Sequence, residues 1–139
     1  MRNLSHSDFS SGKQVFEELG CASCHTPKMQ TGNTSTFAAL NNRTFYPFTD
    51  LLLHDMGPGL ASGFPSFSAK PMEWRTAPLW GMGLSKKVSG REGFLHDGRA
   101  KTLEEAILWH GGEALNSQQN YKNLSAEQRR TLMFFLESP

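Results

Sequence analysis

The chain has 139 residues, a length that argues for one domain over residues 1–139. Its 14 basic and 13 acidic residues nearly cancel, and no apolar run approaches the ~20 residues of a transmembrane helix. We therefore expect neither nucleic-acid binding nor membrane insertion. Sixteen Leu and ten Phe stand against two Val and one Ile, which disfavours parallel sheets and β-sandwiches. The composition predicts an all-α domain.

The first predicted helix lies near the N-terminus. Ser11 and Gln14 have the spacing of a capping box, and the apolar residues Val15, Phe16 and Leu19 follow. The pattern predicts a helix that begins near Ser11 and leads to a pair of cysteines. Residues 1–9 are polar and are predicted to form a flexible tail.

Two more capping boxes predict helices in the second half of the chain. The box at residues 102–105 precedes a stripe with helical spacing, formed by Leu103, Ala106, Ile107 and His110. Two glycines at 111–112 predict its end. The box at residues 125–128 opens a third helix that runs towards Pro139. The domain should therefore contain about three main helices.

The stretch between Thr26 and Lys101 contains many Gly and Pro residues and no repeat. At most one short helix is predicted in it, near residues 49–56. Loops of this length are uncommon in compact domains unless they are functional or disordered, and this stretch is too rich in Phe, Leu and Trp for a solvated linker. We expect long loops that wrap around a large apolar group.

A short motif carries the chemistry. Cys21 and Cys24 are separated by two residues and followed by His25, which is the attachment signature of c-type haem. One covalent haem c would be bonded through both thiols, with His25 on the iron. A thioredoxin-like dithiol would need a βαβ context that the composition does not favour. A zinc site would need further ligands, which His54, His96 and His110 could supply.

Four segments resemble a known family: residues 12–27 with the Cys motif, 46–59, 73–81 and 94–112. They are similar to the C-terminal haem domain of bacterial di-haem cytochrome c peroxidases, in particular to the subgroup of di-haem thiol oxidoreductases. The resemblance covers about residues 9–137. It implies a cytochrome c-like fold in which Gly12 lets the last helix cross closely and Phe16 packs on that crossing.

The resemblance also bears on the sixth ligand of the iron. In the family this ligand lies fourteen residues after the His of a His-Asp-Gly segment, and fourteen residues after His96 is His110. The family often has Met at this position, so His110 is a departure. Met56 is the main alternative ligand, because a Met in a loop some thirty residues after the haem motif is common in cytochromes c. His54 and an open site remain as further alternatives.

Three further residues are predicted to contact the haem. Arg75 is the natural partner of a propionate because its planar fork matches a carboxylate, although a surface ion pair would also explain it. We expect His96 near a propionate or the haem edge, and Trp80 packed on that edge.

Two nitrogen ligands would fill the iron, so the sequence favours electron transfer over catalysis. The domain would relay electrons between a redox protein and a second haem domain. Peroxidase chemistry after loss of the sixth ligand is the alternative, but the chain contains a single Cys-x-x-Cys-His, so it is not expected to be catalytic alone. Covalent haem attachment implies a periplasmic protein whose signal peptide is absent from this chain.

Overall fold

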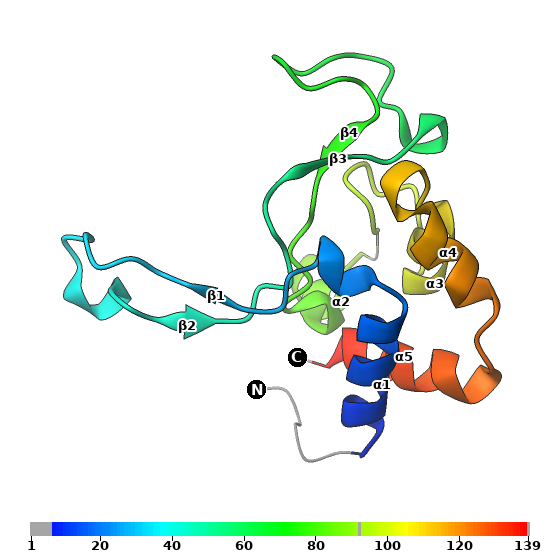
Figure 1. Ribbon diagram of the computed structural model, residues 1–139, viewed down its shortest axis with the longest axis horizontal. Coiled ribbons are helices and arrows are strands. Elements are labelled where there is room, and N and C mark those ends of the chain that lie inside the picture. Colours follow the sequence, from blue (N-terminus) through cyan, green and yellow to red (C-terminus); the bar gives the residue numbers. More distant parts are fainter. Residues whose placement is uncertain (1–6, 92, 139) are drawn as a thin grey trace.

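The computed structural model describes residues 7–91 and 93–138. It contains five α-helices and two small antiparallel sheets (Figure 1). The helices are α1 (Ser7–Glu18), α2 (Ser85–Ser89), α3 (Leu103–Trp109), α4 (Leu115–Lys122) and α5 (Ala126–Glu137). The three predicted helices correspond to α1, α3 and α5. The domain is helical but not purely all-α, and no helix in the described ranges is long and apolar enough to cross a membrane.

The closest helix packing is between α1 and α5. A Cβ atom added to Gly12 of α1 would overlap the carbonyl oxygen of Thr131 and lie 2.7 Å from the Cβ of Phe135. The rings of Phe16 and Phe135 lie 5.3 Å apart beside this crossing. Glycine is therefore required at position 12, as the resemblance implied, and the buried aromatic cluster of the domain lies here.

Helix α1 begins earlier than the sequence predicted. It starts at Ser7 rather than Ser11, and Phe9 is buried with its ring 5.1 Å from that of Phe135. The prediction of a tail over residues 1–9 is therefore wrong for residues 7–9, and residues 1–6 lie outside the described part. Burial of Phe9 against α5 favours this extra turn over a start at Ser11.

A cap substitution tests both helix starts. At the start of α5, Ser125 accepts a hydrogen bond from the Gln128 amide, and the Gln128 side chain accepts one from the Ser125 amide. Ser125→Ala should lower the free energy of unfolding by about 1 kcal/mol in urea denaturation. Ser11 is exposed inside α1, so Ser11→Ala should be neutral or slightly stabilising, because alanine is the better helix former. If Ser11→Ala lowered the free energy of unfolding as much as Ser125→Ala, the start of α1 at Ser7 would be contradicted.

The stretch between Thr26 and Lys101 contains four short strands. Strands β1 (Met29–Gln30) and β2 (Thr44–Phe45) pair antiparallel, as do β3 (Leu53–Asp55) and β4 (Glu73–Arg75). The helix predicted near residues 49–56 is absent, and β3 occupies part of that range. Phe48 and Leu51 have φ angles of 56° and 62°, which a right-handed helix cannot contain.

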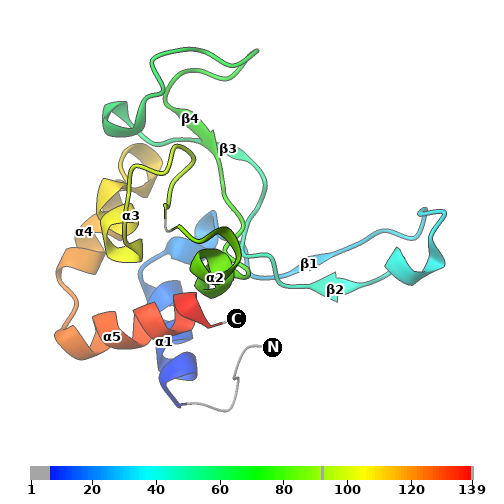
Figure 2. The same ribbon diagram turned by 180° about the vertical axis from the view of Figure 1, so that it is seen from behind.

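The segment that contains β1 and β2 points away from the helices in both views (Figures 1 and 2). Near its tip, the side chain of Phe37 is 71% exposed. This part of the long loop therefore extends away from the helices and does not line the cavity described below. The walls of the site come instead from the end of α1, the Cys motif, the chain between His54 and Gln118, and α5.

Candidate functional site

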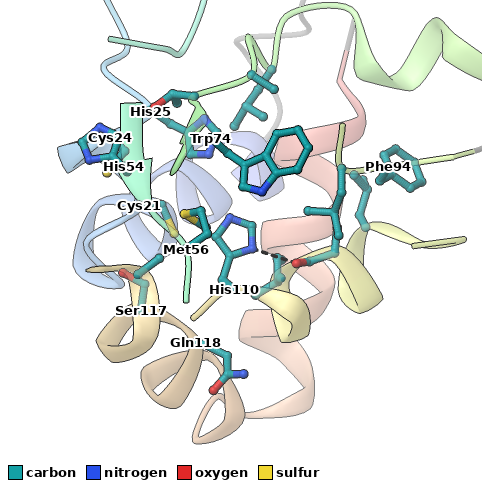
Figure 3. A pocket seen from close by; sticks show the side chains of 18 of the residues that line it. Cys21, Cys24, His25, His54, Met56, Trp74, Phe94, His110, Ser117 and Gln118 are labelled. Carbon is teal, nitrogen blue, oxygen red and sulfur yellow. Dashed lines mark hydrogen bonds between the residues drawn. The ribbon is translucent and has the colours of Figure 1, made fainter. Parts of the chain in front are cut away.

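One cavity, with a volume of about 220 Å³, contains nearly all of the predicted site residues. It lies beside the α1–α5 pair and is bordered by the end of α1, the β3–β4 sheet, the loop before α3, and helices α3 and α4 (Figure 3). Its apolar walls include Phe16, Leu60, Leu79, Leu103, Ile107 and Leu132. Such walls suit a large apolar ligand.

The Cys motif follows α1 directly. Gly20 adopts a left-handed conformation with a φ of 81°, and the 3-10 turn η1 (Cys21–Ser23) begins after it. The amide of His25 donates a hydrogen bond to the carbonyl of Cys21 at 2.9 Å, which closes a single helical turn. Cys21, Cys24 and His25 all line the cavity.

The two cysteines are free thiols. Burial raises the pKa of Cys21 to about 11, and burial together with the carboxylates of Asp50 and Glu113 raises the pKa of Cys24. Both groups are therefore protonated at neutral pH. A thioredoxin-like dithiol needs a lowered thiol pKa, so this environment disfavours that alternative.

His25 is held by its backbone surroundings. Its Nδ1 donates a hydrogen bond to the carbonyl of Phe48 at 3.1 Å. Burial lowers the pKa of His25 to about 4, so the ring is neutral at pH 7. A neutral imidazole with its hydrogen on Nδ1 carries its lone pair on Nε2, which is the state that a metal ligand requires.

His110 is arranged in the same way. It is the C-cap residue of α3, and its Nδ1 donates a hydrogen bond to the carbonyl of Ala106 at 2.7 Å. Burial lowers the pKa of His110 as well. The cavity thus contains two neutral imidazoles, His25 from the Cys motif and His110 from α3, each with its Nδ1 occupied by a carbonyl.

The alternative ligands are also close to the cavity. Met56 lines it, and its thioether sulfur is drawn in Figure 3 among the cavity side chains. His54 lines it too, but its Nε2 lies 2.8 Å from Asp50 and its Nδ1 lies 2.8 Å from Glu113. These two carboxylates, Glu113 foremost, raise the pKa of His54. Both ring nitrogens of His54 are therefore occupied by carboxylates and do not face a metal in the cavity.

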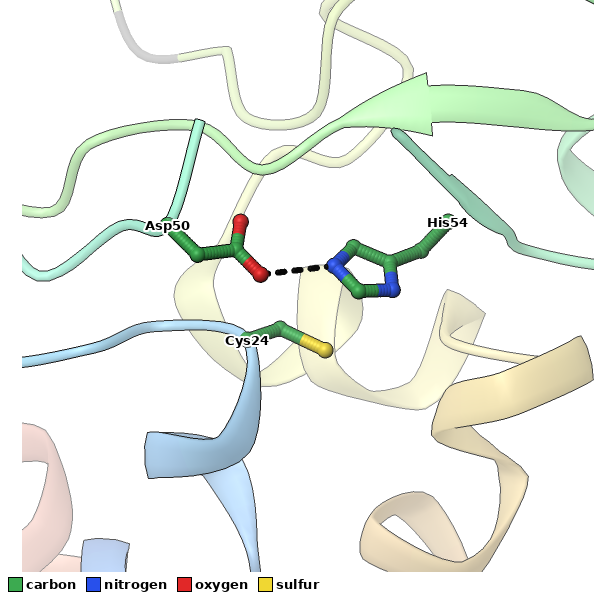
Figure 4. Close-up of side chains that lie close together, drawn as sticks. All are labelled: Cys24, Asp50 and His54. Carbon is green, nitrogen blue, oxygen red and sulfur yellow. Dashed lines mark hydrogen bonds and ion pairs between the residues drawn. The ribbon is translucent and has the colours of Figure 1, made fainter. Parts of the chain in front are cut away.

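The zinc hypothesis can be compared with this geometry. Ligand atoms of Cys24, Asp50 and His54 lie within 4.8 Å of one another (Figure 4). His96, one of the histidines suggested for zinc, does not join them. Its ring stacks on Trp74 with centroids 4.9 Å apart, and its Nε2 donates to the carbonyl of Arg75 at 2.6 Å. The His54–Asp50 ion pair explains the cluster without a metal.

The structure places Trp80 away from the lining of the cavity. Its side chain is 54% exposed and packs on Phe45, with centroids 5.8 Å apart, and it does not line the cavity. Trp74 of β4 lines the cavity instead, and its indole N–H donates to the carbonyl of Leu60 at 2.7 Å. Arg75 and His96 both border the cavity as predicted, while their contact with propionates stays a prediction.

Helix α4 brings two polar residues that the sequence analysis missed. Ser117 and Gln118 line the cavity (Figure 3). The side chain of Gln118 donates a hydrogen bond to the carbonyl of Leu108 at 2.7 Å. The segment of α4 is polar on most positions, so it carries no apolar stripe that could have revealed a helix.

The residues present fit a c-type haem. The cavity combines apolar walls with two neutral nitrogen donors, two protonated thiols next to one of those donors, and an arginine at its border. A flat apolar ring with carboxylate substituents matches this set in polarity and charge.

Comparison with known proteins agrees with this donor set. A family model described as "Di-haem oxidoreductase, putative peroxidase" matches residues 1–139. No curated protein and no solved structure matches the chain. The match indicates haem binding and a haem-based redox function. The chain belongs to this di-haem oxidoreductase family.

Proposed function

We propose that the chain is a cytochrome c-like domain that carries one covalent haem c and transfers electrons. The observation that carries this proposal is the pair His25 and His110, two neutral imidazoles in one apolar cavity beside Cys21 and Cys24. When bound, the haem would supply one-electron redox chemistry.

Each residue of the site has a role in this proposal. Cys21 and Cys24 would hold the haem covalently through their thiols. His25 and His110 would hold the iron, and the carbonyls of Phe48 and Ala106 keep the hydrogen of each ring on Nδ1, which leaves Nε2 free to bind it. Two nitrogen ligands favour a low-spin centre with a lower potential than His/Met ligation gives.

The remaining residues would bind the periphery. Arg75 would pair with a propionate, and His96, fixed against Trp74, would stand next to it. Met56 is the alternative sixth ligand. We place the domain as the C-terminal, relay domain of a di-haem oxidoreductase of the thiol oxidoreductase subgroup, with a redox protein or a second haem domain as its partner in the periplasm.

Peroxidase chemistry at this haem is the second candidate, and one observation favours it. His110 lies at the C-cap of α3 and is followed by Gly111 and Gly112, so a sixth ligand here stands at the end of a helix rather than inside one. Departure of His110 would open the iron to peroxide. Rapid binding of cyanide and peroxide by a high-spin oxidised protein would favour this candidate.

Covalent attachment is the first test. Expressed with a cytochrome c maturation system, the chain should gain the mass of one haem, and acidic organic solvent should not extract it. Cys21→Ser and Cys24→Ser should each weaken attachment, and the double variant should abolish it. Ser23→Ala, which changes an exposed residue between the two cysteines, serves as the control. A chain without a Soret band and with stoichiometric zinc would contradict the proposal.

A further inference from the structure

The segment after His110 is pressed against the chain around Met56. A Cβ atom added to Gly111 would lie 2.9 Å from the carbonyl oxygen of Met56, and one added to Gly112 would overlap the carbonyl oxygen of Asp55. The two backbones therefore touch directly. Such a contact needs something to hold it, because the glycines themselves contribute no side chain.

The carboxylate of Glu113 holds this contact. One oxygen accepts a hydrogen bond from the amide of Asp55 at 2.9 Å, and the other lies 2.8 Å from Nδ1 of His54. Glu113 thus binds β3 twice, immediately after the two glycines. Its side chain is 55% exposed, so these contacts cost little burial of the charge.

His54 extends the connection to the other side of the cavity. Its Nε2 lies 2.8 Å from the carboxylate of Asp50. Asp50 stands two residues after Phe48, whose carbonyl accepts the hydrogen bond from His25. A continuous series of contacts therefore runs from His25 to the segment that follows His110.

We infer that Glu113, through His54 and the Asp55 amide, is a positioning residue that keeps His110 in place as the sixth ligand. The inference rests on the proposed function and adds to it the device that fixes the distal ligand. His110 ends α3, so its backbone is held on one side by the helix and on the other by residues 111–113, which Glu113 joins to β3. Without the Glu113 carboxylate, residues 111–113 lose their contacts with the His54 ring and the Asp55 amide.

The test compares three variants of the haem-loaded chain. Glu113→Ala should produce a high-spin fraction and speed cyanide binding by about 10-fold, the lower end of what losing an outer-shell partner of a metal site causes. Glu113→Gln keeps an acceptor for the Asp55 amide and should restore much of the wild-type rate. Amide hydrogen exchange in the peptide that covers residues 108–115 should be fastest in Glu113→Ala, slower in Glu113→Gln and slowest in the wild type. These readouts separate positioning from stability, because the exposed Glu113 should leave the melting temperature nearly unchanged.

Glu73→Ala is the matched control. Glu73 lies opposite Asp55 in the β3–β4 pair, and the hydrogen bond of its side chain is to the nearby Lys70 amide. The control removes the same charge close to the contacts of Glu113 with His54 and Asp55, without changing residues 111–113. Its cyanide rate should equal that of the wild type.

Different results overturn different statements. If the wild type holds covalent haem and Glu113→Ala binds cyanide no faster than Glu73→Ala, the positioning role is wrong and the proposed function stands. A near-infrared methionine-to-iron band in the wild type would also overturn the positioning role of Glu113, since Met56 and not His110 would then be the sixth ligand. If the wild type holds no covalent haem, the proposed function and the inference fail together.

Discussion

Replacing His110 by methionine should keep a six-coordinate haem and raise its reduction potential, by a noticeable part of the roughly 0.8 V that axial ligation spans. The thioether stabilises the reduced iron relative to an imidazole, so the direction follows from the ligand alone. His110→Ala should instead leave five-coordinate, high-spin iron that binds cyanide quickly. Potentiometry and absorption spectra of both redox states would measure these changes.

Met56→Ala is the control for this substitution. Met56 lines the same cavity, so its removal perturbs the same walls without touching α3. The spectrum and the potential should stay close to those of the wild type. Loss of the sixth ligand in Met56→Ala, with an unaltered spectrum in His110→Ala, would reverse the assignment of the two residues.

The second large effect concerns the helix crossing. Gly12→Ala should lower the free energy of unfolding by about 1–3 kcal/mol, the usual cost of adding a group to a well-packed core. The added methyl group would overlap the Thr131 carbonyl, which belongs to the backbone of α5 and cannot rotate away. The two helices would have to separate at the centre of the aromatic cluster. Urea denaturation, followed by circular dichroism, would measure the loss.

Gly32→Ala is a suitable control because a Cβ atom there has no neighbour within 4 Å. Both substitutions reduce the entropy of the unfolded chain to a similar extent. The difference between their free energies of unfolding therefore reports the cost of the clash at the α1–α5 crossing. Equal stabilities of the two variants would show that α1 and α5 do not pack as described.

Local signals explain most of what the sequence predicted correctly. The cap of α5 depends on Ser125 and Gln128, three residues apart, and the haem motif spans five residues. A spacing of helical period puts His110 on the side of Leu103, Ala106 and Ile107, and in the structure His110 is the C-cap of α3 and lines the cavity.

The errors come from contacts between distant residues. Trp74 and not Trp80 reaches the cavity because β4 pairs with β3, and that register cannot be read from either strand alone. Helix α4 has no apolar stripe and is anchored largely by Tyr121, which is buried and donates its hydroxyl to Glu104. The partner of His54, Glu113, lies 59 residues away in the chain.

The aromatic cluster and the cavity share a wall, formed by Phe16 and Leu132, and this has a consequence for maturation. Phe9, Phe16 and Phe135 give the α1–α5 pair a core of its own, and Cys21 follows that pair directly. The thiols thus follow directly on buried aromatic packing. Leu103 and Ile107 of α3 pack against the same cluster and line the cavity, so thioether formation would complete a wall that this packing already supports. A maturation enzyme would meet a half-assembled domain whose attachment site is already in place.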